Sequence, residues 1–169
     1  MPQFETSRKV RHSADKMFAL VADVEKYPHF LPLCEALAVR SRKERDGRTV
    51  LVADMTVGYK AIRETFTSQV HLKPDENVID VKYLDGPFKY LSNEWRFEAA
   101  EGGSPAPLFF DYEFKSPPPR AIMGAGFDYE FKSRILGAMM GAMFDRAFRM
   151  FAEAFEKRAD AIYGSAGAS

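Results

Sequence analysis

The stretch from Arg134 to Tyr163 contains no proline, and it constrains the fold more than any other feature of this sequence. Ser133 precedes the stretch as a suitable N-cap, and Gly164 follows it as a stop signal. Apolar side chains recur every three or four residues, which indicates a helix with one apolar face. Such a helix of about 30 residues is about 45 Å long, so it can cross a whole sheet. The apolar positions are Met140, Phe144, Phe148, Phe151 and Phe155.

The segments before this helix have the pattern of β-strands. In 60–72 the apolar Ile62, Phe66 and Val70 alternate with polar residues, which describes a strand with one solvent-facing side. Asp46-Gly47 marks a hairpin turn between two further segments of this kind. The pattern predicts strands at 3–11, 35–45, 48–58, 60–72, 78–84, 92–99 and 108–115.

Two short helical segments are expected near the N-terminus. Ser13 can cap a helix over 14–22, and Pro28 and Pro32 bracket a turn-rich segment over 27–33. The order of elements predicts an α+β fold, in which a curved antiparallel sheet of about six or seven strands is covered on one face by the long C-terminal helix.

One seven-residue sequence occurs twice. Phe-Asp-Tyr-Glu-Phe-Lys-Ser stands at 110–116 and again at 127–133. Only one copy can take the strand position before the long helix, and a short connection favours the first copy. We therefore expect 117–132 to be an exposed excursion, and the duplicated segment 117–133 to be dispensable.

Length and charge set the class of protein. The 169 residues fit one domain over 1–163 with a disordered tail over 164–169. Lys plus Arg equals Asp plus Glu at 24 each, so DNA binding through bulk charge is not expected. Cys34 is the only cysteine, and the N-terminus lacks the pattern of a signal peptide. The expected location is the cytoplasm, with peripheral contact at the inner face of the membrane.

Catalytic and metal-binding motifs are not evident in the sequence. His12, His29 and His71 lack the spacing of metal ligands, so no metal site is expected. Asp54 and Glu64 lie on neighbouring predicted strands and offer an acid–base pair, although solvated strand residues are the more common outcome. We expect no catalytic residues and no enzymatic activity.

Three segments of the chain resemble one known family. Phe30-Leu31-Pro32-Leu33-Cys34 is similar to a Phe-Leu-Pro-Trp-Cys element of the coenzyme Q-binding START-domain family, within the Bet v 1-like helix-grip (SRPBCC, polyketide cyclase) superfamily. The segments 83–97 and 132–159 resemble that family's Gly-Pro-Phe stretch and terminal helix. Leu33 stands where the family usually carries Trp.

This resemblance implies a function without catalysis. Members are implied to bind ubiquinone or a related polyisoprenoid lipid as a ligand and to support respiratory electron transport. One branch is implied to be a toxin that binds the large ribosomal subunit and blocks subunit association, with Arg40, Arg42, Lys43 and Arg45 as the candidate basic patch here. A polyketide cyclase-like enzyme is a third alternative.

The expected ligand site is an apolar cavity under the long helix. Tyr83, Asn93 and Trp95 are the candidate hydrogen-bond donors to a quinone head. The segments 87–91 and 30–33 are expected to flank the mouth and to touch the membrane surface. The predicted ligand-binding residues are Phe30, Leu33, Phe66, Tyr83, Phe88, Leu91, Trp95, Phe97, Phe114, Met140, Phe144 and Phe148.

Overall fold

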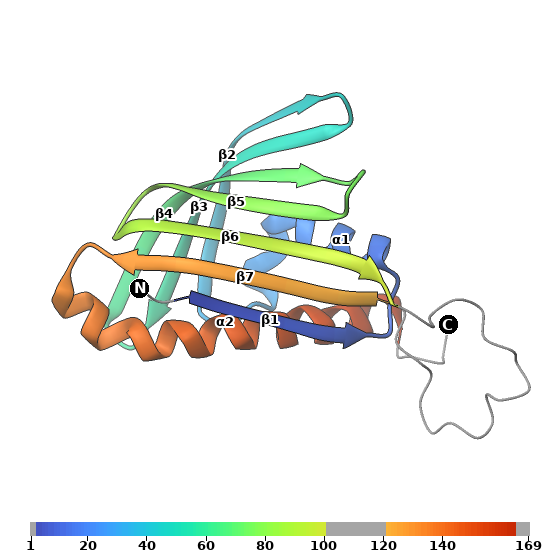
Figure 1. Ribbon diagram of the computed structural model, residues 1–169. Helices are drawn as coiled ribbons and strands as arrows, with labels where there is room; N and C mark the ends of the chain where they lie inside the picture. Colours follow the sequence, from blue (N-terminus) through green and yellow to red (C-terminus); the bar gives the residue numbers. More distant parts are fainter. Residues whose placement is uncertain (1–2, 101–120, 165–169) are drawn as a thin grey trace, which may run out of the picture.

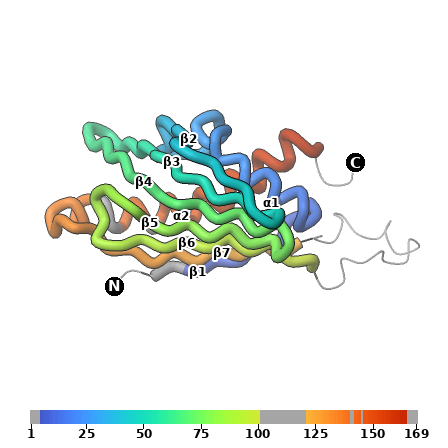
Figure 2. The backbone as a smooth tube through the Cα atoms, turned by 90° about the horizontal axis from the view of Figure 1, so that it is seen from above, coloured from blue at the N-terminus to red at the C-terminus, as the bar shows by residue number. Residues whose placement is uncertain are grey.

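The computed structural model describes residues 3–100 and 121–164. Its described part contains one antiparallel sheet of seven strands in the order β1-β7-β6-β5-β4-β3-β2. Seen from above, the strands lie side by side in this order (Figure 2). The strands are β1 (Gln3–Val10), β2 (Cys34–Arg45), β3 (Arg48–Tyr59), β4 (Ile62–Lys73), β5 (Val78–Asp85), β6 (Phe88–Ala99) and β7 (Ala121–Phe131).

In the part of the chain that the structure describes, three helices accompany the sheet. The long helix α2 (Arg134–Tyr163) runs beneath the sheet, which curves around it (Figure 1). The α-helix α1 (Ala14–Ala22) and the 3-10 helix η1 (Val24–His29) connect β1 to β2. The α+β helix-grip prediction is confirmed, including the two short N-terminal helices.

Both α-helices begin where their serine caps predict. The Ser13 hydroxyl accepts a hydrogen bond from the Lys16 amide at 3.2 Å, and the Ser133 hydroxyl accepts one from the Leu136 amide at 3.1 Å. Each side chain satisfies one of the free amide groups in the first turn of its helix.

The second copy of the repeat, not the first, supplies a strand of the sheet. Phe127, Tyr129 and Phe131 lie in β7 and face the core, with exposed fractions of 6%, 1% and 8%. β7 pairs with β6 on one side and with β1 on the other. The expectation that 117–132 is an exposed excursion is therefore wrong for 121–131. The first copy, 110–116, lies outside the described residues, as do Phe114 and the tail residues 165–169.

β6 begins four residues earlier than predicted. Phe88 and Leu91 belong to the strand, and Phe88 is 0% exposed. Phe88 lies among five aromatic rings, with centroid distances between 4.7 and 6.1 Å. A buried strand residue cannot meet a membrane surface, so the prediction that this segment flanks the mouth and touches the membrane surface is wrong for Phe88 and Leu91. The five rings are Phe66, Tyr83, Tyr129, Phe131 and Phe144.

Candidate functional site: an apolar cavity between helix and sheet

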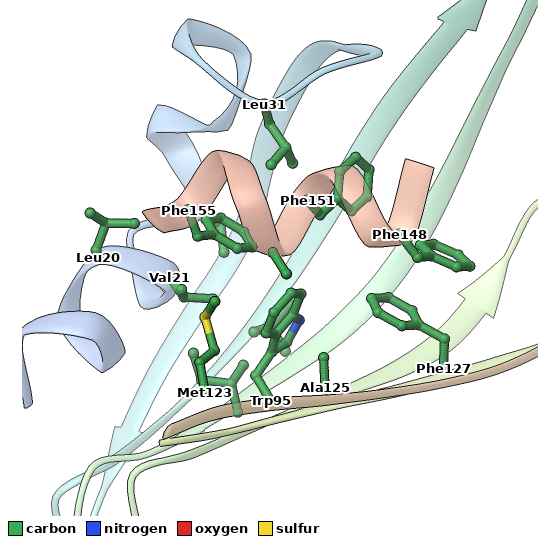
Figure 3. Packing of buried hydrophobic residues seen from close by; sticks show 14 of the residues in the cluster. Leu20, Val21, Leu31, Trp95, Met123, Ala125, Phe127, Phe148, Phe151 and Phe155 are labelled. Atoms are coloured by element: carbon green, nitrogen blue, oxygen red, sulfur yellow. The ribbon is translucent and has the colours of Figure 1, made fainter. Parts of the chain in front are cut away.

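An internal cavity of about 100 Å³ lies between α2, η1 and the concave face of the sheet. Phe148 and Phe155 of α2 point from the helix toward Phe127 and Trp95 of the sheet, and Phe151 lies on the side of the helix near Leu31 (Figure 3). The remaining lining residues come from η1, the loop after it, and strands β2 to β6: Val24, Tyr27, Leu31, Leu37, Ala53, Met55, Phe66, Ser68, Val70, Ile79, Val81, Leu91 and Asn93.

Chain periodicity explains why these residues meet. Positions 148, 151 and 155 of a helix lie on one face because they are three and four residues apart. In the strands every second residue faces the same side, so Phe66, Ser68 and Val70 of β4 share the concave face.

Aromatic contacts across the cavity join the helix to the sheet. The rings of Phe127 and Phe148 stack at 3.9 Å between centroids, with planes 9° apart. The Trp95 and Phe155 rings meet edge to face at 5.0 Å. Such pairs stabilise packing beyond the burial of their area, so these contacts hold α2 against β6 and β7.

Few polar groups face the cavity. The Tyr27 hydroxyl donates to the Val21 carbonyl at 2.5 Å, and burial raises the pKa of this phenol. The Asn93 side-chain amide donates to the Gly126 carbonyl at 2.9 Å. The Ser68 hydroxyl is buried and has no hydrogen-bond partner within the described part of the chain.

A second, much smaller apolar cavity of about 10 Å³ adjoins the first. Phe151 lines both cavities, so its ring lies between them. Leu33 and Met143 at the second cavity are partly buried. This cavity therefore lies near the rim where α2 passes β3. Its lining residues are Leu33, Val57, Gly58, Met143, Phe144, Ala147 and Phe151.

The structure brings together part of the predicted ligand set. Phe66, Leu91, Trp95 and Phe148 line the main cavity. Leu33 and Phe144 line the small one. The side chain of Met140 lies outside what the structure describes, as does Phe114.

Four predicted residues lie elsewhere. Phe30 lines a groove on the outer side of α2. Phe88 packs in the aromatic cluster described above, and Phe97 meets Phe18 edge to face at 6.2 Å. The Tyr83 hydroxyl accepts a hydrogen bond from the Phe88 amide at 3.0 Å, which places it at the β5–β6 turn and away from the cavity. Of the three expected donors, Asn93 and Trp95 reach the cavity lining.

Sequence reasoning missed Ser68 and the contribution of η1 to the lining. Ser68 lies between Phe66 and Val70 on the inward-facing positions of β4. The alternation along this strand could therefore have predicted that Ser68 faces the cavity. Tyr27 and Leu31 of the turn-rich segment reach the cavity because η1 packs on β2 and α2. This packing joins distant segments, so a local sequence pattern cannot predict it.

Asp54, one member of the candidate acid–base pair, does not face the cavity. Asp54 accepts a hydrogen bond from the Thr67 hydroxyl at 2.5 Å and pairs with Arg40 at 2.7 Å. These contacts hold the pKa of the Asp54 carboxyl below its usual range, whereas a general acid needs a raised value. Its neighbours Ala53 and Met55 take the cavity side, so Asp54 lies on the outer face of the sheet.

The single cysteine is not prepared for nucleophilic chemistry. Burial raises the pKa of the Cys34 thiol to about 11, which disfavours the reactive thiolate.

The arginines of the predicted basic patch form ion pairs. Arg40, Arg42 and Arg45 pair with the acidic side chains of Asp54, Glu25 and Asp46 at 2.7, 3.1 and 3.9 Å. In the described part of the chain no group of three or more His, Cys, Asp or Glu residues is placed to hold a metal ion. No helix there is both long and apolar enough to span a bilayer.

The sequence of residues 10–156 matches the family model of polyketide cyclase/dehydrase and lipid transport proteins. The chain belongs to this family. The ribosome association toxin RatA of Vibrio cholerae is 36% identical to this chain over 117 residues, which cover 69% of this chain and 78% of the toxin. The mitochondrial coenzyme Q-binding protein COQ10 of Drosophila melanogaster is 34% identical over 111 residues, which cover 63% of this chain and 44% of that protein.

Solved structures of similar proteins share the architecture. An 18 kDa protein of Caulobacter crescentus, CC1736, superposes with a TM-score of 0.74 at 28% identity, covering 98% of this chain and 100% of that protein. The aromatase/cyclase ZhuI of a Streptomyces species superposes with a TM-score of 0.70 at 20% identity, covering 97% and 98% of the two chains. At this identity the second likeness shows the fold alone.

Proposed function

We propose that the protein binds an apolar ligand between α2 and the concave face of the sheet and does not convert it chemically. The observation that carries the proposal is the buried cavity, whose lining is almost entirely aliphatic and aromatic and extends along about two turns of α2. Sites of this kind hold small molecules through apolar contact and a few polar groups.

The ligand that we propose is a polyprenyl quinone such as ubiquinone, bound in support of respiratory electron transport. A quinone ring is flat and apolar on its faces, which suits a cavity bordered by Trp95, Phe127 and Phe148. The COQ10 relative is named for binding coenzyme Q, and this supports the proposal.

Cavity size sets a condition on binding. Ligand pockets usually enclose roughly 300–1,000 Å³, whereas the main cavity encloses about 100 Å³. A polyprenyl quinone can therefore enter only if α2 moves away from part of the sheet.

Trp95 provides a direct assay, because it is the only tryptophan in the chain and it lines the cavity. Purified protein should release a polyprenyl quinone on solvent extraction, detected by mass spectrometry. After extraction, titration with decylubiquinone should quench the Trp95 fluorescence to saturation. Extracts without lipid, together with fluorescence that decylubiquinone leaves unchanged, would rule the proposal out.

A cavity-filling variant makes this test specific. Ala53 is 4% exposed and lines the cavity, so the larger side chain of Ala53→Leu should occupy part of the space and reduce quenching. Ala142→Leu is the matched control, because Ala142 is exposed on α2. Thermal unfolding of both variants checks that they fold.

Ribosome binding is the second candidate function, favoured by the 36% identity to a ribosome association toxin. The three arginines of the candidate patch on β2 form ion pairs with acidic side chains. Lys43 lies in the same strand and adds a further positive charge to the patch. Co-sedimentation of the purified protein with large ribosomal subunits at moderate salt would support this function. Failure to co-sediment at low and moderate salt would exclude it.

A further inference from the structure

Ser68 is a polar residue of the cavity lining with unused hydrogen-bonding capacity. Its side chain is 6% exposed, and its hydroxyl has no partner in the described part of the chain. The Tyr27 hydroxyl and the Asn93 amide also face the cavity, but each already donates to a backbone carbonyl. A buried hydroxyl without a partner is costly to the folded protein, so its place on the cavity wall suits a hydrogen bond to a bound molecule.

The strand register places Ser68 at one end of an apolar track. Ser68 lies opposite Ala53 of β3. The next inward-facing residues of β3 are Met55, in the main cavity, and Val57, in the small cavity. Four residues of a strand span about 13 Å, so the track from Ala53 to Val57 has the length of an extended chain of about ten carbon atoms.

The same track continues along the helix toward the rim. Phe151 separates the two cavities, and Met143 lies two turns before it on α2. Met143 and Leu33 are partly exposed beside Val57, which is buried. A chain that followed β3 would thus pass the Phe151 ring and reach solvent between Leu33 and Met143.

We infer that Ser68 donates a hydrogen bond to the polar group of a bound amphiphile, and that the ligand's apolar tail follows β3 past Phe151 and leaves between Leu33 and Met143. The inference rests on the proposed function and adds the orientation of the ligand. It requires a ligand with a hydrogen-bond acceptor at one end, such as a ring carbonyl, and an unbranched or isoprenoid tail at the other.

The first experiment separates the polar contact from apolar binding. Ser68→Ala and wild type are titrated with decylubiquinone and with decylbenzene, which has the same tail and no carbonyl, and affinities are taken from the rise in Tm with ligand concentration. Ser68→Ala should bind decylubiquinone roughly two- to tenfold more weakly and bind decylbenzene as wild type does. Ser92→Ala is the control, because Ser92 is exposed on the outer face of β6.

Each result of this experiment is decisive. Decylubiquinone bound equally by wild type and Ser68→Ala would overturn the inference and leave the proposed function standing. Binding of neither compound to wild type would overturn the proposed function itself. The unliganded Ser68→Ala variant should keep or gain thermal stability, and a Tm several degrees lower would show a structural role for the hydroxyl and overturn the inference.

The second experiment tests the direction of the tail. Met143→Glu puts a charge at the rim and should weaken decylubiquinone binding several-fold, while binding of the same dimethoxymethylbenzoquinone ring without a tail should be unchanged. Ala142→Glu, at the neighbouring exposed position of α2, is the control. Equal effects of Met143→Glu on the two ligands, or no effect on either, would overturn the assigned tail direction.

Discussion

At the scale of single residues, both the backbone conformation at position 86 and the nearby Phe66 require glycine there. Its φ of +143° is rarely adopted by residues with a side chain, and a Cβ placed there would lie 2.7 Å from the Cβ of Phe66. Gly86→Ala should therefore lower the free energy of unfolding by about 1–3 kcal/mol, as measured by denaturant titration. Gly47→Ala is the control, because Gly47 has φ +80° and nothing within 4 Å of the added Cβ. A smaller loss at Gly86 than at Gly47 would contradict the close contact.

Cys34 gives a pH-dependent prediction. Burial raises the pKa of its thiol from 9.0 to about 11, so at neutral pH its thiolate fraction is roughly a hundredfold below that of an ordinary cysteine. The rate of alkylation by iodoacetamide in the folded protein should be slow at pH 7 and should rise with pH until about 11. The unfolded chain loses this proton first, so stability should also fall as pH rises above 9.0. Rapid labelling at pH 7 would show that the thiol is accessible and ionised.

Three serines show which residue roles could be predicted from the sequence. Ser13 and Ser133 cap helices as predicted, because capping depends on neighbours three residues away. The position of Ser68 on the cavity wall depends on β3, β6 and α2 together, and alternation along β4 could show only that it faces inward. Local chemistry was therefore predictable, whereas the cavity wall required the packing of distant segments.

At the scale of elements, β7 shows how a correct principle selected the wrong segment. Short connections are common, and this favoured the first copy of the repeat. A longer pattern decides otherwise: Ala121, Met123, Ala125, Phe127 and Tyr129 face the core on alternate positions. Pro105 and Pro107 would break the same alternation upstream of the first copy. The full length of the alternating pattern was visible in the sequence and outweighs the length of the connection.

Two deletions of 17 residues, 104–120 and 117–133, test this assignment and leave one copy of the repeat each. Ala99 pairs with Ala121, so removal of 104–120 leaves residues 100–103 as a four-residue hairpin loop with two glycines. This variant should fold with a Tm close to that of the parent. Removal of 117–133 would place Pro105 and Pro107 in a strand paired on both sides, and it should lose several degrees of Tm or fail to fold. The reverse order of stability would restore the first copy to the sheet.

At the scale of the whole molecule, α2 is attached unequally along its length. Its C-terminal half is tied to the start of the chain by Arg8–Glu156 at 2.5 Å, His12–Asp160 at 2.7 Å and the Tyr163 hydroxyl, which donates to the Lys16 carbonyl at 3.2 Å. Its N-terminal half carries Ile135 and Met139, which are 73% and 62% exposed. The N-terminal half also passes the small cavity that we assign to the ligand tail.

This asymmetry predicts how the cavity opens. A cavity of about 100 Å³ must expand to admit a quinone, and we expect the N-terminal end of α2, where Ile135 and Met139 are exposed, to separate from the sheet at lower cost. Hydrogen exchange followed by mass spectrometry should show faster exchange in residues 134–143 than in 150–160, and bound decylubiquinone should slow exchange mainly in the first segment. Glu156→Gln weakens the attachment at the C-terminal end of α2 and should speed hydrogen exchange in 150–160. Bound decylubiquinone should not reverse this faster exchange in 150–160. Uniform exchange along α2, or ligand protection confined to 150–160, would place the opening at the C-terminal half instead.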